Sequence, residues 1–144
     1  MSAASSNDRF RIELPEGWED RTVHCFLGPE DGGVQHVLQL VVDRNVNTDD
    51  LAEYARDRVD QIIESMPAAE ILKEEETTLA NGSPAYEVVY KWVPATGQVM
   101  FQKLVYVIHD GVAYSFSAGF SKKTMKTIAV EVDRIINSFE PTGE

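Results

Sequence analysis

Short segments in which valine, isoleucine, leucine and aromatic side chains recur at every second position run along most of the chain. This period-two pattern is typical of β-strands. Glycine, proline, Asn-Gly and Asp-Gly separate the segments, and these residues favour turns. The pattern predicts strands at residues 10–14, 22–27, 34–43, 71–79, 85–93, 98–108 and 112–119.

Two further segments have apolar residues at helical spacing. The first follows Thr48, a candidate N-cap, and ends at Pro67. The second follows Ser121, also a candidate N-cap, and ends near Phe139. The predicted order is therefore βββ-α-ββββ-α, an α+β fold with a mostly antiparallel sheet of about six or seven strands flanked by two main helices. Strands and helices do not alternate, which argues against a doubly wound parallel sheet.

Length and composition fit one soluble domain. The chain has 144 residues, and we expect a short flexible tail at 1–9 and a single domain at 10–141. The formal net charge of −11 argues against binding to nucleic acid or to anionic lipid. The single cysteine excludes an intrachain disulfide, and residues 1–9 do not resemble a signal peptide. We expect a cytoplasmic protein that does not insert into membranes.

The residue types that carry catalysis do not gather in a recognisable motif. The three histidines lie in three different segments, without the spacing of a zinc site. His24 and Cys25 are adjacent on a strand, so their side chains point to opposite faces and cannot form a nucleophilic pair. Glu74, Glu75 and Glu76 fit a solvated strand edge. We therefore expect a non-enzymatic protein without a metal or another cofactor.

Several predicted strands are apolar on both faces. On the strand at 98–108, Leu104, Tyr106 and Ile108 oppose a second face that carries Val105 and Val107. One interpretation is that each face of the sheet is covered by one helix, so that both faces are core. The other is that one face stays partly open to bind a second copy or an apolar segment of a partner. The pattern alone does not choose between them.

The chain resembles the DcrB-related proteins over nearly its whole length. The motifs that carry the likeness are FRIELPEGWEDRTVHCF from Phe10, VVDRN from Val41, FQKLVYVIHDGVAYSFSAG from Phe101, and IINSFEP from Ile135. This resemblance implies a Mog/PsbP-like fold. Within it, the chain is most similar to the Eag-type chaperones of type VI secretion, which are cytoplasmic homodimers. The resemblance therefore implies that the partner is an effector protein whose N-terminal transmembrane helices the chaperone holds until export.

The resemblance also implies a set of partner-binding residues. Two positions follow the tryptophan, two lie on the first helix, two on the third strand and one on the sixth strand. They correspond here to Val23, Cys25, Arg58, Met66, Gln39, Asp43 and Gln102. Cys25 replaces an aliphatic residue of those chaperones, and Arg58 replaces a glutamine.

Two other functions remain open at this point. A general adaptor or assembly factor of the same fold would bind through polar loops or sheet edges. A small-molecule binding protein or an enzyme would use a closed pocket between sheet and helix.

Overall fold

The computed structural model of the protein describes residues 2–6, 11–18, 21–31, 34–44, 46, 48–66 and 68–141. It contains the elements β1 (Ser2–Ser6), β2 (Arg11–Pro15), β3 (Arg21–Asp31), β4 (Val34–Asp43), α1 (Leu51–Ser65), β5 (Glu70–Thr78), β6 (Pro84–Trp92), β7 (Met100–His109), β8 (Val112–Ser121) and α2 (Ile128–Asn137).

Six of these strands form one antiparallel sheet in the order β3-β4-β8-β7-β6-β5. The predicted α+β class and the predicted order of strands and helices are confirmed. The Asp-Gly pair predicts the tight turn that the structure has between β7 and β8. Asp110 and Gly111 both have positive φ there, at 50° and 76°. Two such residues in succession are what a type I′ hairpin turn requires.

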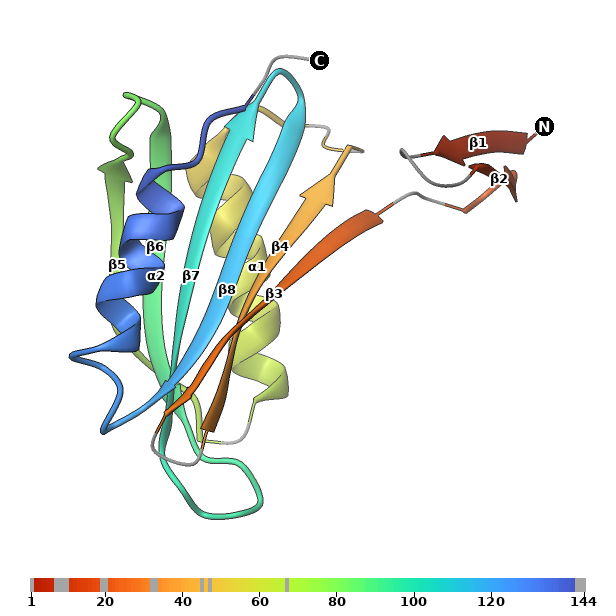
Figure 1. Ribbon diagram of the computed structural model, residues 1–144. Coiled ribbons are helices and arrows are strands. Elements are labelled where there is room, and N and C mark those ends of the chain that lie inside the picture. Colours follow the sequence, from red (N-terminus) through yellow and green to blue (C-terminus); the bar gives the residue numbers. More distant parts are fainter. Residues whose placement is uncertain are drawn as a thin grey trace.

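The N-terminal segment differs from the expectation. Strand β2, which matches the strand predicted at 10–14, pairs with β1 and not with the six-stranded sheet. Residues 2–6, expected to belong to a tail, therefore form a strand. The β1–β2 hairpin lies beyond the upper end of β3, apart from the main sheet (Figure 1).

Both helices begin later than the sequence pattern indicates. The N-cap of α1 is Asp50, whose carboxylate accepts from the Glu53 backbone N–H at 3.1 Å, and not Thr48, which instead accepts from the Asp50 N–H. Ser121 is not the N-cap of α2, because β8 continues as far as Ser121, which pairs with Met100. Turns occupy residues 122–127, and the helix begins at Ile128.

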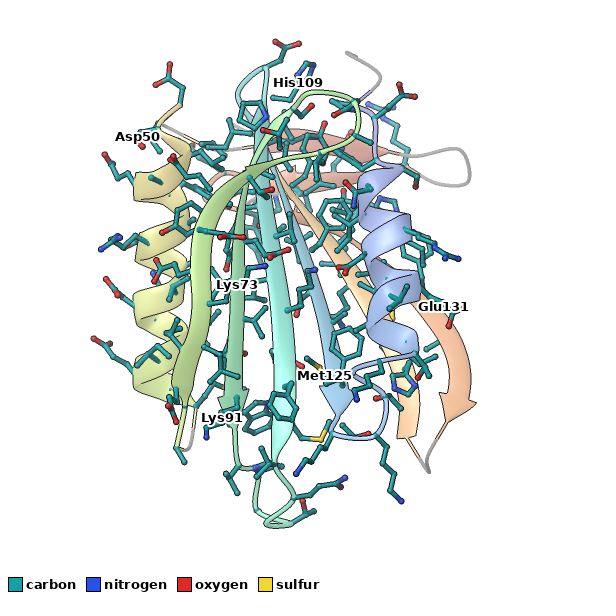
Figure 2. All side chains as sticks on the ribbon, turned by 90° about the vertical axis from the view of Figure 1, so that its left-hand side faces the viewer. Asp50, Lys73, Lys91, His109, Met125 and Glu131 are labelled. Atoms are coloured by element: carbon teal, nitrogen blue, oxygen red, sulfur yellow. The ribbon has the colours of Figure 1, made fainter. Side chains whose placement is uncertain are left out.

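One helix packs on each face of the sheet, which gives three layers (Figure 2). The buried hydrophobic side chains of the described residues form two cores, one under each helix. The core under α1 joins the buried Tyr54, Ala55 and Val59 to Val88 and Tyr106 of the sheet. The core under α2 consists of the buried side chains Leu38, Leu79, Ala85, Val105, Val107, Phe116, Ala118, Phe120, Ile128, Val132 and Ile136. The double-sided apolar pattern of the strands therefore reflects two cores, each under its own helix.

An ion-pair network joins α2 to the sheet. The Lys103 ammonium pairs with Asp133 of α2 and lies 3.0 Å from a Glu87 carboxylate oxygen, while Lys73 approaches the other oxygen at 2.6 Å. Burial acts to raise the pKa of the Glu87 carboxyl, but the two lysines outweigh it and hold that pKa below its usual 4.5. The Glu87 side chain therefore remains an anion inside the network.

Candidate functional site

The strand β8 has small residues on the face that it shares with α1. Ala113, Ser115, Ser117 and Gly119 occupy alternate positions there, whereas Phe116 and Phe120 point to the opposite face and are buried in the other core. Ala113 is buried in the core under α1. Because α1 packs mainly against β6 and β7, Ser115, Ser117 and Gly119 remain partly exposed. A groove runs along β8 as a result.

We call this feature the β8 groove and define it by two adjoining hollows that share Ser117. The larger, of about 550 Å³, lies between the sheet and α1. Its lining comprises Val41, Asp43, Tyr54, Arg58, Gln61, Ile62, Ser65, Leu104, Tyr106, Ser115, Phe116 and Ser117. The smaller, of about 310 Å³, continues along the strand. Its lining comprises Val37, Gln39, Met100, Gln102, Ser117, Ala118 and Gly119.

Strand β3 forms the outer margin of this face. The register β3–β4–β8 places Val23 beside Val41 and Ser115, and Cys25 beside Gln39 and Ser117. Val23 is 53% exposed, and Cys25 is exposed as well. The apolar surface of the groove therefore extends outwards onto the edge strand, where water covers it in the isolated chain.

Two glutamines lie within the groove. Gln39 is exposed on β4, and Gln102 is half-buried on β7, opposite Gly119. The Gln102 Nε2 donates a long hydrogen bond of 3.5 Å to the Ser117 Oγ. The groove thus places amide groups among aliphatic walls.

A charged pair forms part of the lining of the larger hollow. The Arg58 Nη2 lies 3.2 Å from the Asp43 Oδ2, to which the Tyr54 hydroxyl also donates at 3.4 Å. The Arg58 guanidinium stacks 4.0 Å from the centre of the Tyr54 ring. Burial raises the pKa of the neighbouring Tyr106 phenol far above its usual value, so this hydroxyl remains neutral.

The structure brings six of the seven sequence-predicted residues to one face. Val23, Cys25, Gln39 and Gln102 present side chains to the groove or its margin. Asp43 and Arg58 line the groove but bind each other. Met66 is the C-cap of α1, and its half-buried side chain packs against the core under that helix.

Sequence reasoning missed the floor of the groove. The sequence gives no reason to choose Ser115, Ser117 or Gly119, because the two serines have no general base in the same pattern and glycine has no side chain. A signal was nevertheless present in the segment VAYSFSAGFS, where small residues alternate with mostly aromatic ones.

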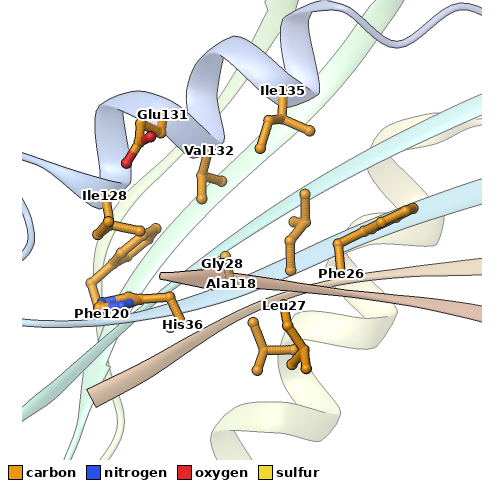
Figure 3. Close-up of a pocket in the computed structure, with 13 residues that line it drawn as sticks. Phe26, Leu27, Gly28, His36, Ala118, Phe120, Ile128, Glu131, Val132 and Ile135 are labelled. Atoms are coloured by element: carbon orange, nitrogen blue, oxygen red, sulfur yellow. The ribbon is translucent and has the colours of Figure 1, made fainter. Parts of the chain in front are cut away.

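A separate, smaller cavity of about 110 Å³ lies on the opposite face, between α2 and strands β3, β4 and β8 (Figure 3). Phe26, the buried His36, Phe120 and Ile135 are among the side chains that line it. Its size suits one side chain and not a helix.

Within the described parts of the chain, no group of three or more histidine, cysteine or acidic residues is arranged to hold a metal ion. No helix among those residues has the length and hydropathy needed to cross a bilayer.

Solved structures resemble this chain over most of its length. PA94 of Pseudomonas aeruginosa, a protein of unknown function, superposes with a TM-score of 0.79 at 13% identity, covering 99% of both chains. LpqN of Mycobacterium tuberculosis, involved in cell envelope biogenesis, gives 0.56 at 14% identity, over 86% of this chain and 85% of that one. The cyanobacterial PsbP of Synechocystis sp. PCC 6803 gives 0.52 at 13% identity, over 96% and 91%.

These similarities establish a PsbP-like fold, in agreement with the expectation from sequence. No curated protein matches the chain by sequence. The model of the DcrB family matches residues 11–138, which is most of the chain. The protein therefore belongs to the DcrB family.

Proposed function

We propose that this protein is a non-enzymatic cytoplasmic chaperone that holds an N-terminal transmembrane helix of a secreted effector in the β8 groove, as the Eag-type chaperones of type VI secretion do. The observation that carries the proposal is the line of small residues on β8, separated only by β4 from an exposed apolar margin on β3. Membership in the DcrB family is consistent with such an adaptor.

The length of the groove supports a helix as its occupant. Its lining runs from Val37 to Asp43 on β4 and from Met100 to Tyr106 on β7, which at roughly 3.3 Å per residue is about 20 Å. The hydrocarbon core that a transmembrane helix crosses is about 30 Å thick. The groove could therefore contact about two thirds of the apolar length of such a helix.

The chemistry of the groove supports a membrane helix in particular. Helices in membranes pack through small residues and through hydrogen bonds from serine, threonine and amide side chains. Ser115, Ser117, Gln39 and Gln102 offer these groups, while Val23 and Val41 offer aliphatic contacts. In water, burying the client would be favourable by roughly 25 cal/mol per Å² of apolar area.

A matched pair of substitutions tests the proposal. Val23 and Phe26 lie on the same strand with exposed fractions of 53% and 52%, but on opposite faces. The client would be the N-terminal transmembrane segment of an effector, co-expressed with the chaperone and recovered by affinity purification. We expect Val23→Asp to abolish recovery and Phe26→Asp to preserve it.

Equal recovery with both variants would contradict a client in the groove and would favour an adaptor that binds through loops or edges. Failure of the wild-type protein to protect any transmembrane segment would contradict the chaperone function itself.

We also propose that the protein works as a homodimer in which β3 pairs with β3 of a second copy. The two edges of the main sheet differ in charge: β5 carries Lys73, Glu74, Glu75 and Glu76, whereas residues 22–28 of β3 include no acidic or basic side chain other than His24. Charged residues protect an edge from pairing. The ends of β3 carry Arg21, Glu30 and Asp31, but the stretch 22–28 is where two copies, each of net charge −11, would repel least.

Antiparallel pairing of β3 with itself would place both β8 grooves on the same side of a continuous sheet, which suits a client with several helices. Light scattering should report a dimer, and a Leu27→Lys substitution, on a side chain that is 71% exposed, should shift it towards the monomer. A monomeric wild-type protein at micromolar concentration would overturn the dimer but not the groove.

A further inference from the structure

Gly119 lies in the interior of β8, where glycine is unusual because it has no side chain to pack. Its φ is not positive, unlike that of Gly82 or Gly111, so the backbone there would accept any residue. A requirement for glycine at this position must therefore come from the space around its missing side chain.

That space is occupied by Gln102. A Cβ built on Gly119 would overlap the Gln102 Oε1 and would lie 3.4 Å from its Cδ, whereas the nearest backbone atom, the Phe101 carbonyl oxygen, is 3.9 Å away. The collision is thus with the flexible end of one side chain and not with the backbone.

The Gln102 amide has its oxygen over Gly119 and its nitrogen towards Ser117. The Nε2 donates to the Ser117 Oγ at 3.5 Å. In the register of β7 and β8, Gln102 is directly opposite Gly119, and Ser117 is opposite Leu104, the next residue of β7 on the same face. The Gln102 side chain therefore lies along the floor of the groove, over Gly119 and against Ser117.

We propose that Gly119 is a positioning residue: the absence of its side chain lets Gln102 lie flat in the β8 groove with its amide placed to hydrogen-bond a polar side chain of a bound helix. This inference rests on the proposed function for the identity of the ligand. The placement of Gln102 itself does not depend on any ligand.

The first test uses the protein alone. Gly119→Ala should displace the Gln102 amide, so its side-chain NH₂ signals, assigned with Gln102→Ala, should shift in the NMR spectrum. The melting temperature should change by no more than about 4 °C, because extended backbone accepts alanine. Gly28→Ala is the matched control, since a Cβ there would meet His36 at an ordinary 3.6 Å. Unchanged Gln102 signals in Gly119→Ala would overturn the proposal.

The second test measures selectivity. Two dye-labelled 20-residue Leu/Ala helices with lysine flanks, one with a central asparagine, would be presented in dodecyl maltoside and titrated by fluorescence anisotropy. The wild-type protein and Gly28→Ala should prefer the asparagine helix by about fivefold. Gly119→Ala, Ser117→Ala and Gln102→Ala should reduce this preference below about twofold.

Two outcomes separate the inference from the function on which it rests. Loss of preference in Gln102→Ala but not in Gly119→Ala would overturn the positioning role. If the wild-type protein bound neither helix, the proposed function would fail, and the NMR result would still decide whether Gly119 places Gln102.

Discussion

The pair formed by Arg58 and Asp43 leads to a stability prediction. The Arg58 Nη2 is 3.2 Å from the Asp43 Oδ2, and the two side chains are 27% and 5% exposed. Arg58→Ala would leave the Asp43 carboxylate in a mostly dry position, with the Tyr54 hydroxyl as a remaining donor. We therefore expect this substitution to destabilise the fold in addition to any effect on a client.

The expected size follows from the geometry. At 3.2 Å and an effective dielectric constant of about 20, the attraction is roughly 5 kcal/mol, most of which the desolvation of the two groups offsets. Breaking a fully buried pair costs about 3–5 kcal/mol. Because Arg58 is partly exposed and Tyr54 remains, we expect about 2–3 kcal/mol, or a fall of about 5–10 °C in melting temperature.

Urea unfolding followed by circular dichroism would measure this value for Arg58→Ala, Asp43→Asn and the double variant. The interaction between the two substitutions should be at least about 1.5 kcal/mol. Arg56→Ala is the control, since the Arg56 side chain is 69% exposed and lies 3.9 Å from Glu74, and its unfolding midpoint should not move. Two results would contradict this reasoning. One is that Arg58→Ala lowers the free energy of unfolding no more than Arg56→Ala does, and the other is that it lowers it as much in the Asp43→Asn background as in the wild-type protein. In either case the pair formed by Arg58 and Asp43 would not be the source of the stability.

Three further outcomes are expected. The folded-state pKa of Glu87 is held below 4.5, so the stability that Glu87 contributes should be complete above about pH 5 and lost as the pH falls through that lowered pKa. When the urea midpoint is measured as a function of pH, Glu87→Gln should reduce its change over this acidic range. Tyr86→Phe, which removes a 2.6 Å hydrogen bond to Glu74, should cost about 1 kcal/mol in urea unfolding. The exposed Cys25 should react with Ellman's reagent in the free protein and be protected once a client occupies the groove.

Much of the fold could be predicted from the sequence because its signals are local. Strand alternation, the Asn81-Gly82 and Asp110-Gly111 turns and the apolar stripe of α1 each depend on neighbours within a few residues. The start of α2 could not be predicted in this way. Ser121 has the chemistry of an N-cap, but its pairing with Met100, a residue distant along the chain, keeps it in the sheet.

In the candidate site, too, some features can be predicted from local sequence and others depend on residues distant along the chain. Val23 and Cys25 could be assigned to one face by counting along a single strand. That Asp43 binds Arg58 depends on how α1 lies over the end of β4, which no periodicity encodes. The seating of Gln102 over Gly119 likewise depends on the register between β7 and β8.

Large and small side chains alternate along β8, and this affects how the sequence of the strand can change during evolution. Phe116 and Phe120 support one core, while Ser115, Ser117 and Gly119 face the groove and support neither. Because the two sets occupy opposite faces of one strand, Ser115, Ser117 and Gly119 can be replaced one at a time without repacking either core. Larger apolar residues at these positions would bury more surface and favour the folded state while closing the groove. Selection for stability alone would therefore fill the groove. If the proposed function is correct, small residues on β8 would distinguish the members of the family that bind a client there from those that do not.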